Sequence, residues 1–363
     1  MFSRQVGTSY YASTISNYLR MKQFFIRLAN FLLIGFIPVI ILISTYLYFD
    51  PFKVIRSYSD YSYPYVIPNR DYISTTMFVK NYKKYNYNSF IFGSSRTLAF
   101  KPKSWCRYLS PDDKPYMFDA SCESIYGIYT KIKYLDSINV KIKNALIILC
   151  TDHAFKYLGN HSGHLFIKHP LTSGESKLTF QLEFFKAYLV PKFLFNFYSY
   201  KIIGTYRPFM SGYIEDGKIT YDTITNETNY IDQQTELARN PTEYYAKRKD
   251  MFREKKSEET DVYARINERH LYMIKEIKRI LGKNNTNYKV VISPLFDQVK
   301  FNASDLFVLK KEFGNRLYDF SGRNSFTVNK MNYYEWSHFR PNIGDSILDR
   351  IYKESPMLAR VSK

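Results

Sequence analysis

Short apolar runs separated by longer mixed segments dominate the chain from residue 89 onward. Four of these runs end in small or polar residues: SFIFGSS from residue 89, YMFDAS from 116, ALIILCTD from 145 and YKVVISP from 288. Continuous apolar runs of this length are typical of strands that are buried on both faces, as in a parallel sheet. We therefore expect each run to form an inner strand.

Helical patterns alternate with these runs. Residues 123–138 follow the second run and residues 261–282 precede the fourth, and both carry apolar positions at helical spacing. Near the C-terminus, a further helix is marked by Pro341 at its start and an apolar stripe of Ile343, Ile347 and Ile351. Strands that alternate with helices predict an α/β fold with a doubly wound, mostly parallel sheet. In such sheets the ligand site lies outside the carboxyl ends of the strands.

Two stretches interrupt this alternation. Residues 155–258 contain a hairpin signal, YIEDGKITYD, with Asp216-Gly217 expected at the turn. We expect this stretch to be an insertion that covers the site as a lid or an acceptor-binding element. Residues 50–88 are rich in Tyr, Ser and Pro and have poor periodicity, so we expect a stalk that packs onto a core domain of residues 89–363.

The N-terminal region contains one segment without charges, residues 28–49. Its 22 residues would reach about 33 Å as a helix, enough for the hydrocarbon layer of a bilayer, roughly 30 Å thick. A cleaved signal peptide is the alternative, but its apolar region is shorter and ends at small residues, which the following YLYFDPF lacks. We expect an uncleaved transmembrane anchor.

Charges around this segment predict its orientation. Asp50 follows the span, and the cations that precede it are Arg4, Arg20, Lys22 and Arg27. The positive-inside rule then places residues 1–27 in the cytoplasm as a tail, and the main domain outside, in the periplasm or on the cell surface. The net charge of +19 would attract any polyanion. An extracytoplasmic location argues against nucleic acid and leaves anionic lipids and acidic glycans.

Cysteine and histidine residues do not form a metal-binding pattern. The three cysteines, Cys106, Cys122 and Cys150, lack metal-like spacing, although Cys106 and Cys122 could pair in an oxidising compartment. Three histidines lie between residues 161 and 169, but no nearby acid or cysteine completes a site. We expect neither a metal nor an organic cofactor.

Candidate chemical groups gather where the predicted strands end. These groups are Ser94 and Ser95 after the first strand, Asp119 and Ser121 after the second, Asp152 after the third and Ser293 after the fourth. Arg96 follows the serines and would either bind an anionic group or cap a backbone carbonyl. This convergence at one sheet edge predicts the site.

Glu335 and His338 stand three residues apart, just ahead of the closing helix. On a turn or a first helical turn this spacing puts both side chains on one side, whereas on a strand they would point to opposite faces. A serine hydroxyl is scarcely nucleophilic until a base removes its proton, and the pair would supply that base and its orienting acid for Ser95. The alternatives are a structural Gly-Ser-Ser turn, a surface role for His338, and Asp152-His153 as the acid-base pair.

The motifs FGSSR (residues 92–96) and EWSH (residues 335–338) resemble those of the SGNH, or GDSL-like, hydrolase and acyltransferase superfamily. The resemblance implies a flavodoxin-like, three-layer fold with Ser95 as nucleophile, His338 as base and Glu335 in place of the usual Asp. It also puts Ser121 at the position of a glycine whose N–H serves the oxyanion hole. Asp152 falls where the superfamily has an asparagine, and its carboxylate would repel an oxyanion unless protonated or turned away.

An N-terminal membrane anchor is typical of one branch, which resembles proteins that move D-alanyl or acetyl groups onto teichoic acids and exported polysaccharides. This implies a membrane-anchored, serine-dependent acyl transferase or esterase, acting on O-acetyl groups of a cell-envelope polysaccharide. A multi-pass membrane partner could deliver the acyl group. The second and third motifs of the superfamily, whose glycine and asparagine are replaced here by Ser121 and Asp152, leave an alternative, a non-catalytic glycan-binding or assembly subunit with the same fold. A scaffold bound to anionic lipid would leave the serine and histidine motifs unexplained.

Overall fold

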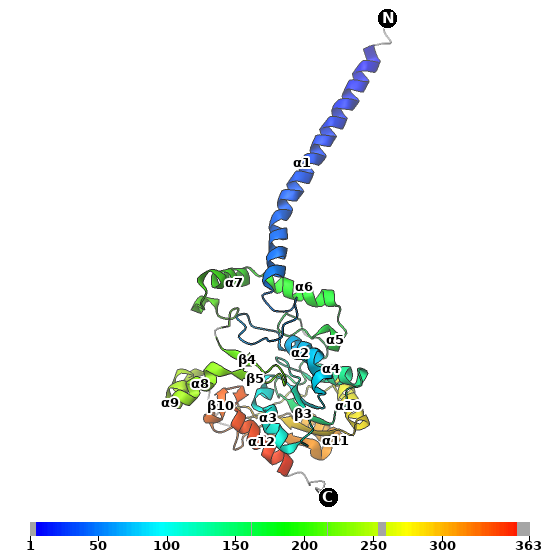
Figure 1. Cartoon of the computed structure of the whole chain (residues 1–363). Helices are drawn as coiled ribbons and strands as arrows, with labels where there is room; N and C mark the ends of the chain where they lie inside the picture. The colour runs from blue at the N-terminus through cyan, green and yellow to red at the C-terminus, as the bar shows by residue number, and fades with distance from the viewer. Residues whose placement is uncertain (1–4, 161, 216, 253–258, 354–363) are drawn as a thin grey trace. The chain divides into compact units, whose positions relative to one another are not determined.

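The protein is described by a computed structural model that covers residues 5–160, 162–215, 217–252 and 259–353 (Figure 1). It divides into two compact units, Met1–Pro51 and Phe52–Lys363. The first unit contains helix α1 (Gln5–Phe49), and within its stretch Tyr18–Phe49 an 18-residue window has a mean hydropathy of 2.4. These 32 residues extend about 48 Å, so the helix is long and apolar enough to cross a membrane. The helix begins well before residue 28, so most of the expected N-terminal tail is helical as well.

The second unit is built on a five-stranded sheet in which all neighbouring strands are parallel. The strand order is β2-β1-β3-β7-β9. The strands are β1 (Ser89–Gly93), β2 (Pro115–Met117), β3 (Asn144–Leu149), β7 (Asn287–Ile292) and β9 (Leu317–Asp319). All four apolar runs form strands, and the predicted doubly wound parallel sheet is confirmed. Because β2 and β3 lie on opposite sides of β1, the order reverses at β1, which is where a site is expected in such sheets.

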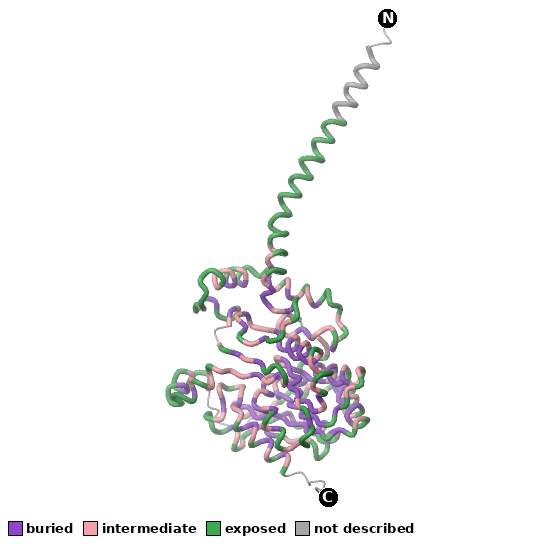
Figure 2. The backbone as a smooth tube through the Cα atoms, in the orientation of Figure 1, coloured by how far each residue is buried: buried purple, intermediate pink, exposed green. Residues whose placement is uncertain are grey.

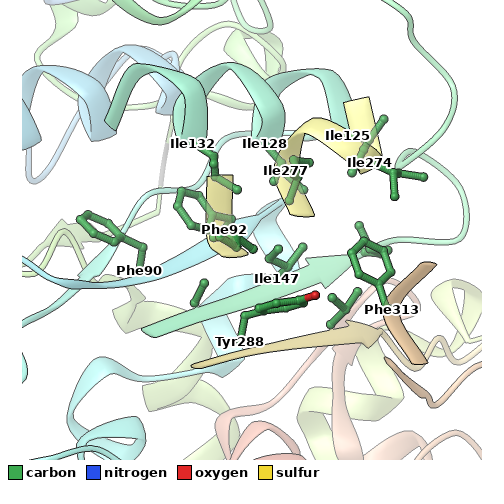
Figure 3. Packing of buried hydrophobic residues seen from close by; sticks show 14 of the residues in the cluster. Phe90, Phe92, Ile125, Ile128, Ile132, Ile147, Ile274, Ile277, Tyr288 and Phe313 are labelled. Carbon is green, nitrogen blue, oxygen red and sulfur yellow. The ribbon is translucent and has the colours of Figure 1, made fainter. Parts of the chain in front are cut away.

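Alternate side chains of the inner strands enter two separate cores. On one face, Phe92 and Ile147 pack beneath helices α4 (Ile125–Ser137) and α10 (Glu268–Lys283), whose isoleucines point down onto the sheet (Figure 3). Helices α2 (Arg70–Tyr85) and α11 (Ala303–Phe313) also contribute to this core. Figure 2 shows buried backbone concentrated in the sheet and the helices packed against it.

The opposite face is covered by the short 3-10 helix η1 (Ser95–Ala99), helix α3 (Pro102–Trp105) and the C-terminal helix α12 (Pro341–Lys353). Helix α12 begins at the proline that was expected to start it, and its isoleucine stripe is buried in the second core. A Cβ atom at Gly344 would lie 2.0 Å from the backbone oxygen of Ala99. Only a glycine therefore lets α12 approach the helix that carries Ser95 this closely.

Gly344→Ala is expected to destabilise the chain by about 1–3 kcal/mol, because the added methyl group must displace backbone. Denaturant unfolding of the full chain, followed by circular dichroism, measures the change. Gly282→Ala is the matched control: it lies in helix α10 with nothing within 4 Å of its added Cβ. That substitution should stabilise the chain by about 0.5–1 kcal/mol, since glycine is a poor helix former. Equal effects of the two substitutions would contradict the close approach.

Residues 52–88, which we expected to be a stalk, belong to the folded unit. Helix α2 lies within this segment, and Asn69 caps it by accepting a hydrogen bond from the N–H of Tyr72 at 2.8 Å. Phe78 of this helix is fully buried in the first core. The segment therefore supplies a helix of the three-layer fold.

The expected insertion holds small elements between β3 and α10. They are α5 (Pro170–Ser173), α6 (Lys177–Tyr188), α7 (Pro191–Ile203), η3 (Pro208–Met210), β4 (Ile219–Tyr221), β5 (Thr228–Tyr230), α8 (Ile231–Arg239), α9 (Pro241–Lys247) and η4 (Lys249–Met251). Strand β6 (Glu259–Thr260) follows the insertion. The hairpin turn was predicted at Asp216-Gly217, but the β4–β5 hairpin turns at residues 222–227, and Asp216 lies outside the described residues. Asp222 directs this turn, because its carboxylate accepts hydrogen bonds from the N–H groups of Ile224 and Thr225.

Candidate active site

Ser94 and Ser95 follow strand β1, which lies between β2 and β3 in the sheet. The strand ends at Gly93, whose φ is +148° and where a Cβ would lie 2.6 Å from the backbone oxygen of Ile148. A glycine is therefore required for the turn to pass so close to β3. Ser94 caps η1 by accepting a hydrogen bond from the N–H of Arg96, and its hydroxyl also contacts the sulfur of Cys150 at 2.7 Å. This leaves Ser95, which is half-buried, at the start of η1.

The structure brings Ser95, His338 and Glu335 together. The Oγ atom of Ser95 lies 2.6 Å from Nε2 of His338, and Nδ1 of the same ring is hydrogen-bonded to Oε1 of Glu335. Glu335 lies in strand β10 (Tyr333–Glu335) and His338 in strand β11 (His338–Phe339), and the two strands form a hairpin with a two-residue turn. Glu335 and His338 are direct cross-strand partners. Residues three apart thus share one face although both belong to strands, because the chain reverses between them.

The tautomer of His338 follows from the state of Glu335. Burial raises the pKa of the Glu335 carboxyl, but the hydrogen bond and charge of His338 and the N–H of Ser337, at 2.8 Å, more than offset this and lower the pKa. An ionised carboxylate can only accept hydrogen bonds, so Nδ1 of His338 carries a proton and donates a hydrogen bond to Glu335. Nε2 is then free to accept the hydroxyl proton of Ser95.

Arg96 connects the loop after β3 with the hairpin of Glu335 and His338. Its buried guanidinium donates two hydrogen bonds to the carboxylate of Asp152, at 2.6 and 3.0 Å. Its Nε atom donates to the backbone oxygen of Ser337, within the hairpin turn, at 3.1 Å. Burial raises the pKa of Asp152, but the hydrogen bonds and charge of Arg96 outweigh this effect, so the pKa lies below its usual value. Asp152 is thus an ionised partner of Arg96, and its carboxylate is turned toward the guanidinium. Arg96 also caps a backbone carbonyl, that of Ser337, which is one of the two roles expected for it.

Ser121 lies in the loop that follows β2, next to the serine turn. The N–H of Ala120 donates to the backbone oxygen of Gly93 at 3.1 Å, and the hydroxyl of Thr97 donates to the carboxylate of Asp119 at 3.1 Å. These contacts hold the loop after β2 against the turn after β1. Ser293, after β7, is fully buried, and among the described residues its hydroxyl has no hydrogen-bond partner.

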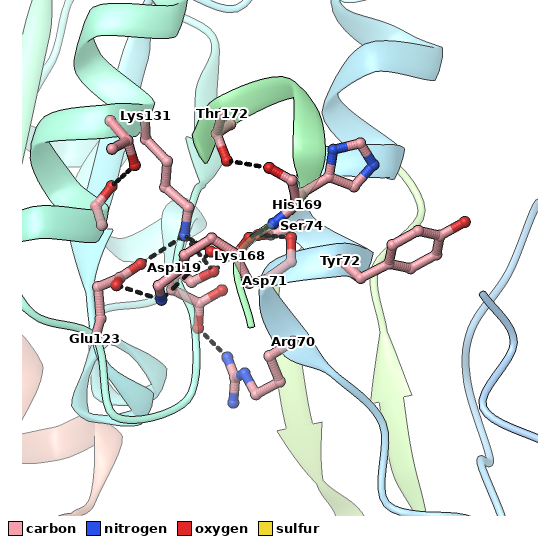
Figure 4. Close-up of polar contacts among 12 residues, drawn as sticks. Arg70, Asp71, Tyr72, Ser74, Asp119, Glu123, Lys131, Lys168, His169 and Thr172 are labelled. Atoms are coloured by element: carbon pink, nitrogen blue, oxygen red, sulfur yellow. Dashed lines mark hydrogen bonds and ion pairs between the residues drawn. The ribbon is translucent and has the colours of Figure 1, made fainter. Parts of the chain in front are cut away.

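Six charged residues form a buried cluster that includes Asp119 and Glu123, which stand on either side of Ser121 in the chain (Figure 4). Its members are Arg70, Asp71, Asp119, Glu123, Lys131 and Lys168, three acids and three bases. Lys131 lies at the centre, 2.7 Å from Glu123 and 3.0 Å from Asp71, and also donates to the backbone oxygen of Asp119 at 2.9 Å. Burial raises the pKa of Asp71, but the charges of Lys131 and Lys168 prevail and lower it to about 2.

This cluster was missed in the sequence because its members are spread from residue 70 to residue 168. Each charged residue in isolation indicates a solvated surface position. The single available signal was Lys131, a cation inside the apolar pattern of residues 123–138.

A cavity of about 130 Å³ opens beside Glu335 and His338. One wall comes from the insertion, through Thr228, Tyr230, Gln233 and Gln234, and the others from Leu98, Lys101, Tyr334, Phe339 and Pro341. The insertion therefore lines a space next to the acid-base pair, in keeping with its expected position over the site. The amide and phenol groups make this wall polar and able to hydrogen-bond.

His164, His169 and the three cysteines make contacts that need no metal. His164 packs on the ring of Phe52, and His169 accepts a hydrogen bond from the N–H of Leu171, while His161 lies outside the described residues. Cys106 and Cys122, for which a disulfide was left open, are free thiols, as is Cys150. Within residues 5–353, gaps excepted, no group of three or more His, Cys, Asp or Glu residues is arranged to hold a metal ion.

Comparison with protein-family models finds no model that matches the chain, and comparison with curated proteins finds no similar sequence. Interpretation of the site therefore depends on its own geometry.

Proposed function

We propose that the chain is a membrane-anchored, serine-dependent acyl transferase or esterase of the SGNH type, acting on O-acetyl groups of a cell-envelope polysaccharide. The observation that carries this proposal is the continuous hydrogen-bond chain from Ser95 through His338 to Glu335. Nucleophilic acyl transfer requires a serine hydroxyl, an imidazole whose Nε2 carries no proton, and an ionised carboxylate, and the site has all three.

The proposed reaction proceeds through an acyl-enzyme. Oγ of Ser95 attacks the acyl carbonyl carbon as its proton passes to Nε2 of His338, and the resulting imidazolium is stabilised by Glu335. The alcohol of the donor ester leaves with that proton, which gives O-acyl-Ser95. Water or a sugar hydroxyl then attacks the acyl carbonyl carbon as its proton passes to Nε2 of His338, and His338 returns that proton to Oγ of Ser95 as the bond between Oγ and the acyl carbon breaks.

The oxyanion of the tetrahedral intermediate would be received by the backbone N–H groups of Ser95 and Ser121. Backbone contacts between their loops favour this arrangement, because they hold the two N–H groups on neighbouring turns. Asp152 would take no part, because its carboxylate is paired with Arg96. Its charge is thereby neutralised near a developing oxyanion.

The cavity beside His338, whose lining does not include Ser95, would take part of a sugar acceptor. At 130 Å³, the space beside His338 is well below the roughly 300–1,000 Å³ typical of pockets for drug-sized ligands. Gln233 and Gln234 would hydrogen-bond a hydroxylated acceptor. In this proposal α1 is the anchor, with residues before it in the cytoplasm, and the domain meets its polysaccharide outside the membrane. The acyl group would come from a multi-pass membrane partner.

A non-catalytic glycan-binding subunit is the second candidate. It is favoured by one observation: the third motif has no side-chain donor for an oxyanion, because Asp152 only accepts and is occupied by Arg96. Such a subunit would keep the cavity and the fold but form no acyl-enzyme.

Trapping the acyl-enzyme tests the proposal. The full chain in lipid nanodiscs should release one equivalent of nitrophenolate rapidly from p-nitrophenyl acetate, and peptide mapping should place one acetyl group on Ser95. Ser304→Ala, at a serine in helix α11, is the matched control and should behave like the wild type. A folded chain that acetylates elsewhere or not at all would contradict the proposal; binding of polysaccharide by that same chain would support the second candidate.

A further inference from the structure

Helices α6 and α7 expose large apolar side chains to a degree that is unusual for a folded surface. Leu178 is 69% exposed, Phe195 65% and Ile202 85%. They belong to a set that we call the α6–α7 face: Leu178, Leu182, Leu189, Val190, Phe195, Ile202, Ile203 and Phe209. The opposite sides of both helices are buried by aromatic residues, so the exposed side is a second apolar face. Large apolar side chains exposed on neighbouring helices indicate a site of interaction.

Cations are interspersed among the apolar residues along the chain. Between residues 177 and 207 the chain has a single acid, Glu183, and five cations, Lys177, Lys186, Lys192, Lys201 and Arg207. All five cations belong to exposed residues. Their charge of +5 against −1 leaves a net +4. Leucine and phenylalanine flanked by lysine and arginine are the composition of elements that lie in the headgroup region of anionic membranes.

Two exposed aromatic side chains already form one patch on this face. The rings of Phe195 and Phe209 lie 5.8 Å apart, although both are largely exposed. Aromatic pairs exposed in this way are energetically favourable in the membrane interface, where one side of each ring meets acyl chains.

Chain connectivity keeps helices α6 and α7 within a short length of chain from the end of α1. Phe52 stacks on Phe193 of α7 at 5.0 Å and contacts Phe184 of α6 at 5.4 Å. Helix α1 ends at Phe49, only three residues earlier, a length of chain that reaches at most about 11 Å. A bilayer crossed by α1 therefore has its surface within short reach of both helices.

We propose that the α6–α7 face lies in the headgroup region of an anionic lipid bilayer, as a second membrane contact of the chain. Leu178, Phe195 and Ile202 insert at the boundary between headgroups and acyl chains, and the five cations bind lipid phosphates. This contact does not depend on acyl transfer at Ser95. It depends on α1 being the anchor only for the proximity that the short linker provides.

Lipid photo-crosslinking of the full chain tests this contact. The chain is reconstituted into nanodiscs of phosphatidylcholine and phosphatidylglycerol that contain a photoactivatable phosphatidylglycerol, and peptides with lipid adducts are identified by mass spectrometry. We expect adducts on peptides from residues 177–207 as well as on α1. In nanodiscs of phosphatidylcholine with a photoactivatable phosphatidylcholine, adducts on residues 177–207 should fall several-fold and those on α1 should not.

A double substitution, Phe195→Glu and Ile202→Glu, should reduce adducts on α6 and α7 several-fold while α1 remains an internal standard. Both side chains are exposed, so folding should be preserved. Phe307→Glu, at a residue of helix α11 that is 69% exposed, is the matched control and should leave adducts on residues 177–207 unchanged. Adducts on α1 alone in anionic nanodiscs would overturn the proposal. So would lysine cross-links between α7 helices of two copies in place of lipid adducts, which would assign the face to a dimer.

Discussion

Ser95→Ala is expected to abolish labelling of the full chain by a fluorophosphonate, a reagent that captures activated serines. His338→Ala should slow labelling by roughly 10²–10⁴-fold, the usual contribution of a general base. The reason is the 2.6 Å contact between Oγ of Ser95 and Nε2 of His338, through which the hydroxyl proton would leave. Labelling rates measured by gel fluorescence at a fixed reagent concentration give both values.

His153→Ala separates this arrangement from its competitor. His153 lies beside Asp152, with its Nε2 atom 3.2 Å from the carboxylate, and these two residues form the other acid-base pair near the site. Burial lowers the pKa of His153, so the ring is neutral near pH 7. We expect His153→Ala to label at nearly the wild-type rate. Loss of labelling in this variant, with labelling retained in His338→Ala, would reassign the base.

Lys131→Met is expected to destabilise the chain by about 3–5 kcal/mol, the usual consequence of removing one partner from a buried ion pair. The substitution leaves Asp71 and Glu123 buried with one cation, Lys168, between them. In thermal unfolding this loss should lower the midpoint by on the order of 10 °C. Lys283→Met is the matched control, because that lysine pairs with Asp136 at 2.8 Å on the surface, where ion pairs contribute about 0–1 kcal/mol.

Adding Glu123→Gln to Lys131→Met tests whether charge balance is the cause. The double variant again buries equal numbers of acids and bases, and Gln still offers an oxygen to Lys168. We expect it to be more stable than Lys131→Met alone, which a double-mutant cycle would report as a coupling energy. If the second substitution destabilised the chain further, by the amount it costs in the wild type, charge imbalance would not be the cause.

The parallel sheet was predictable because its signal is local. Each inner strand is a run of apolar residues, such as residues 145–149, and its pattern needs no partner to be read. Strand β9 escaped prediction because it has only three residues, Leu317–Asp319, all at least partly exposed. Helix α2 escaped because its buried residues include polar ones, Ser74 and Thr75, so its buried face lacks the apolar stripe that marks α10 and α12.

For the site, sequence spacing predicted which residues meet but not how. Glu335 and His338 were expected on one side of a turn or a first helical turn, and they share a face because they are opposed across a tight hairpin. Arg96 was left between two roles, since its partners Asp152 and Ser337 lie 56 and 241 residues away. Contacts over such separations depend on how the sheet orders its strands, which no local pattern contains.

Helix α12 packs against η1 through Gly344 and Ala99, so the site forms only after the last helix has been made. The hairpin of Glu335 and His338 leads directly into α12, so the base reaches Ser95 as the last helix packs against η1. During synthesis, a chain that has emerged only as far as residue 330 already contains the nucleophile, both cores' strands and the insertion, yet has no base. In such a chain Ser95 would have no imidazole beside it, and the contact with His338 would form only once helix α12 had been made and had docked.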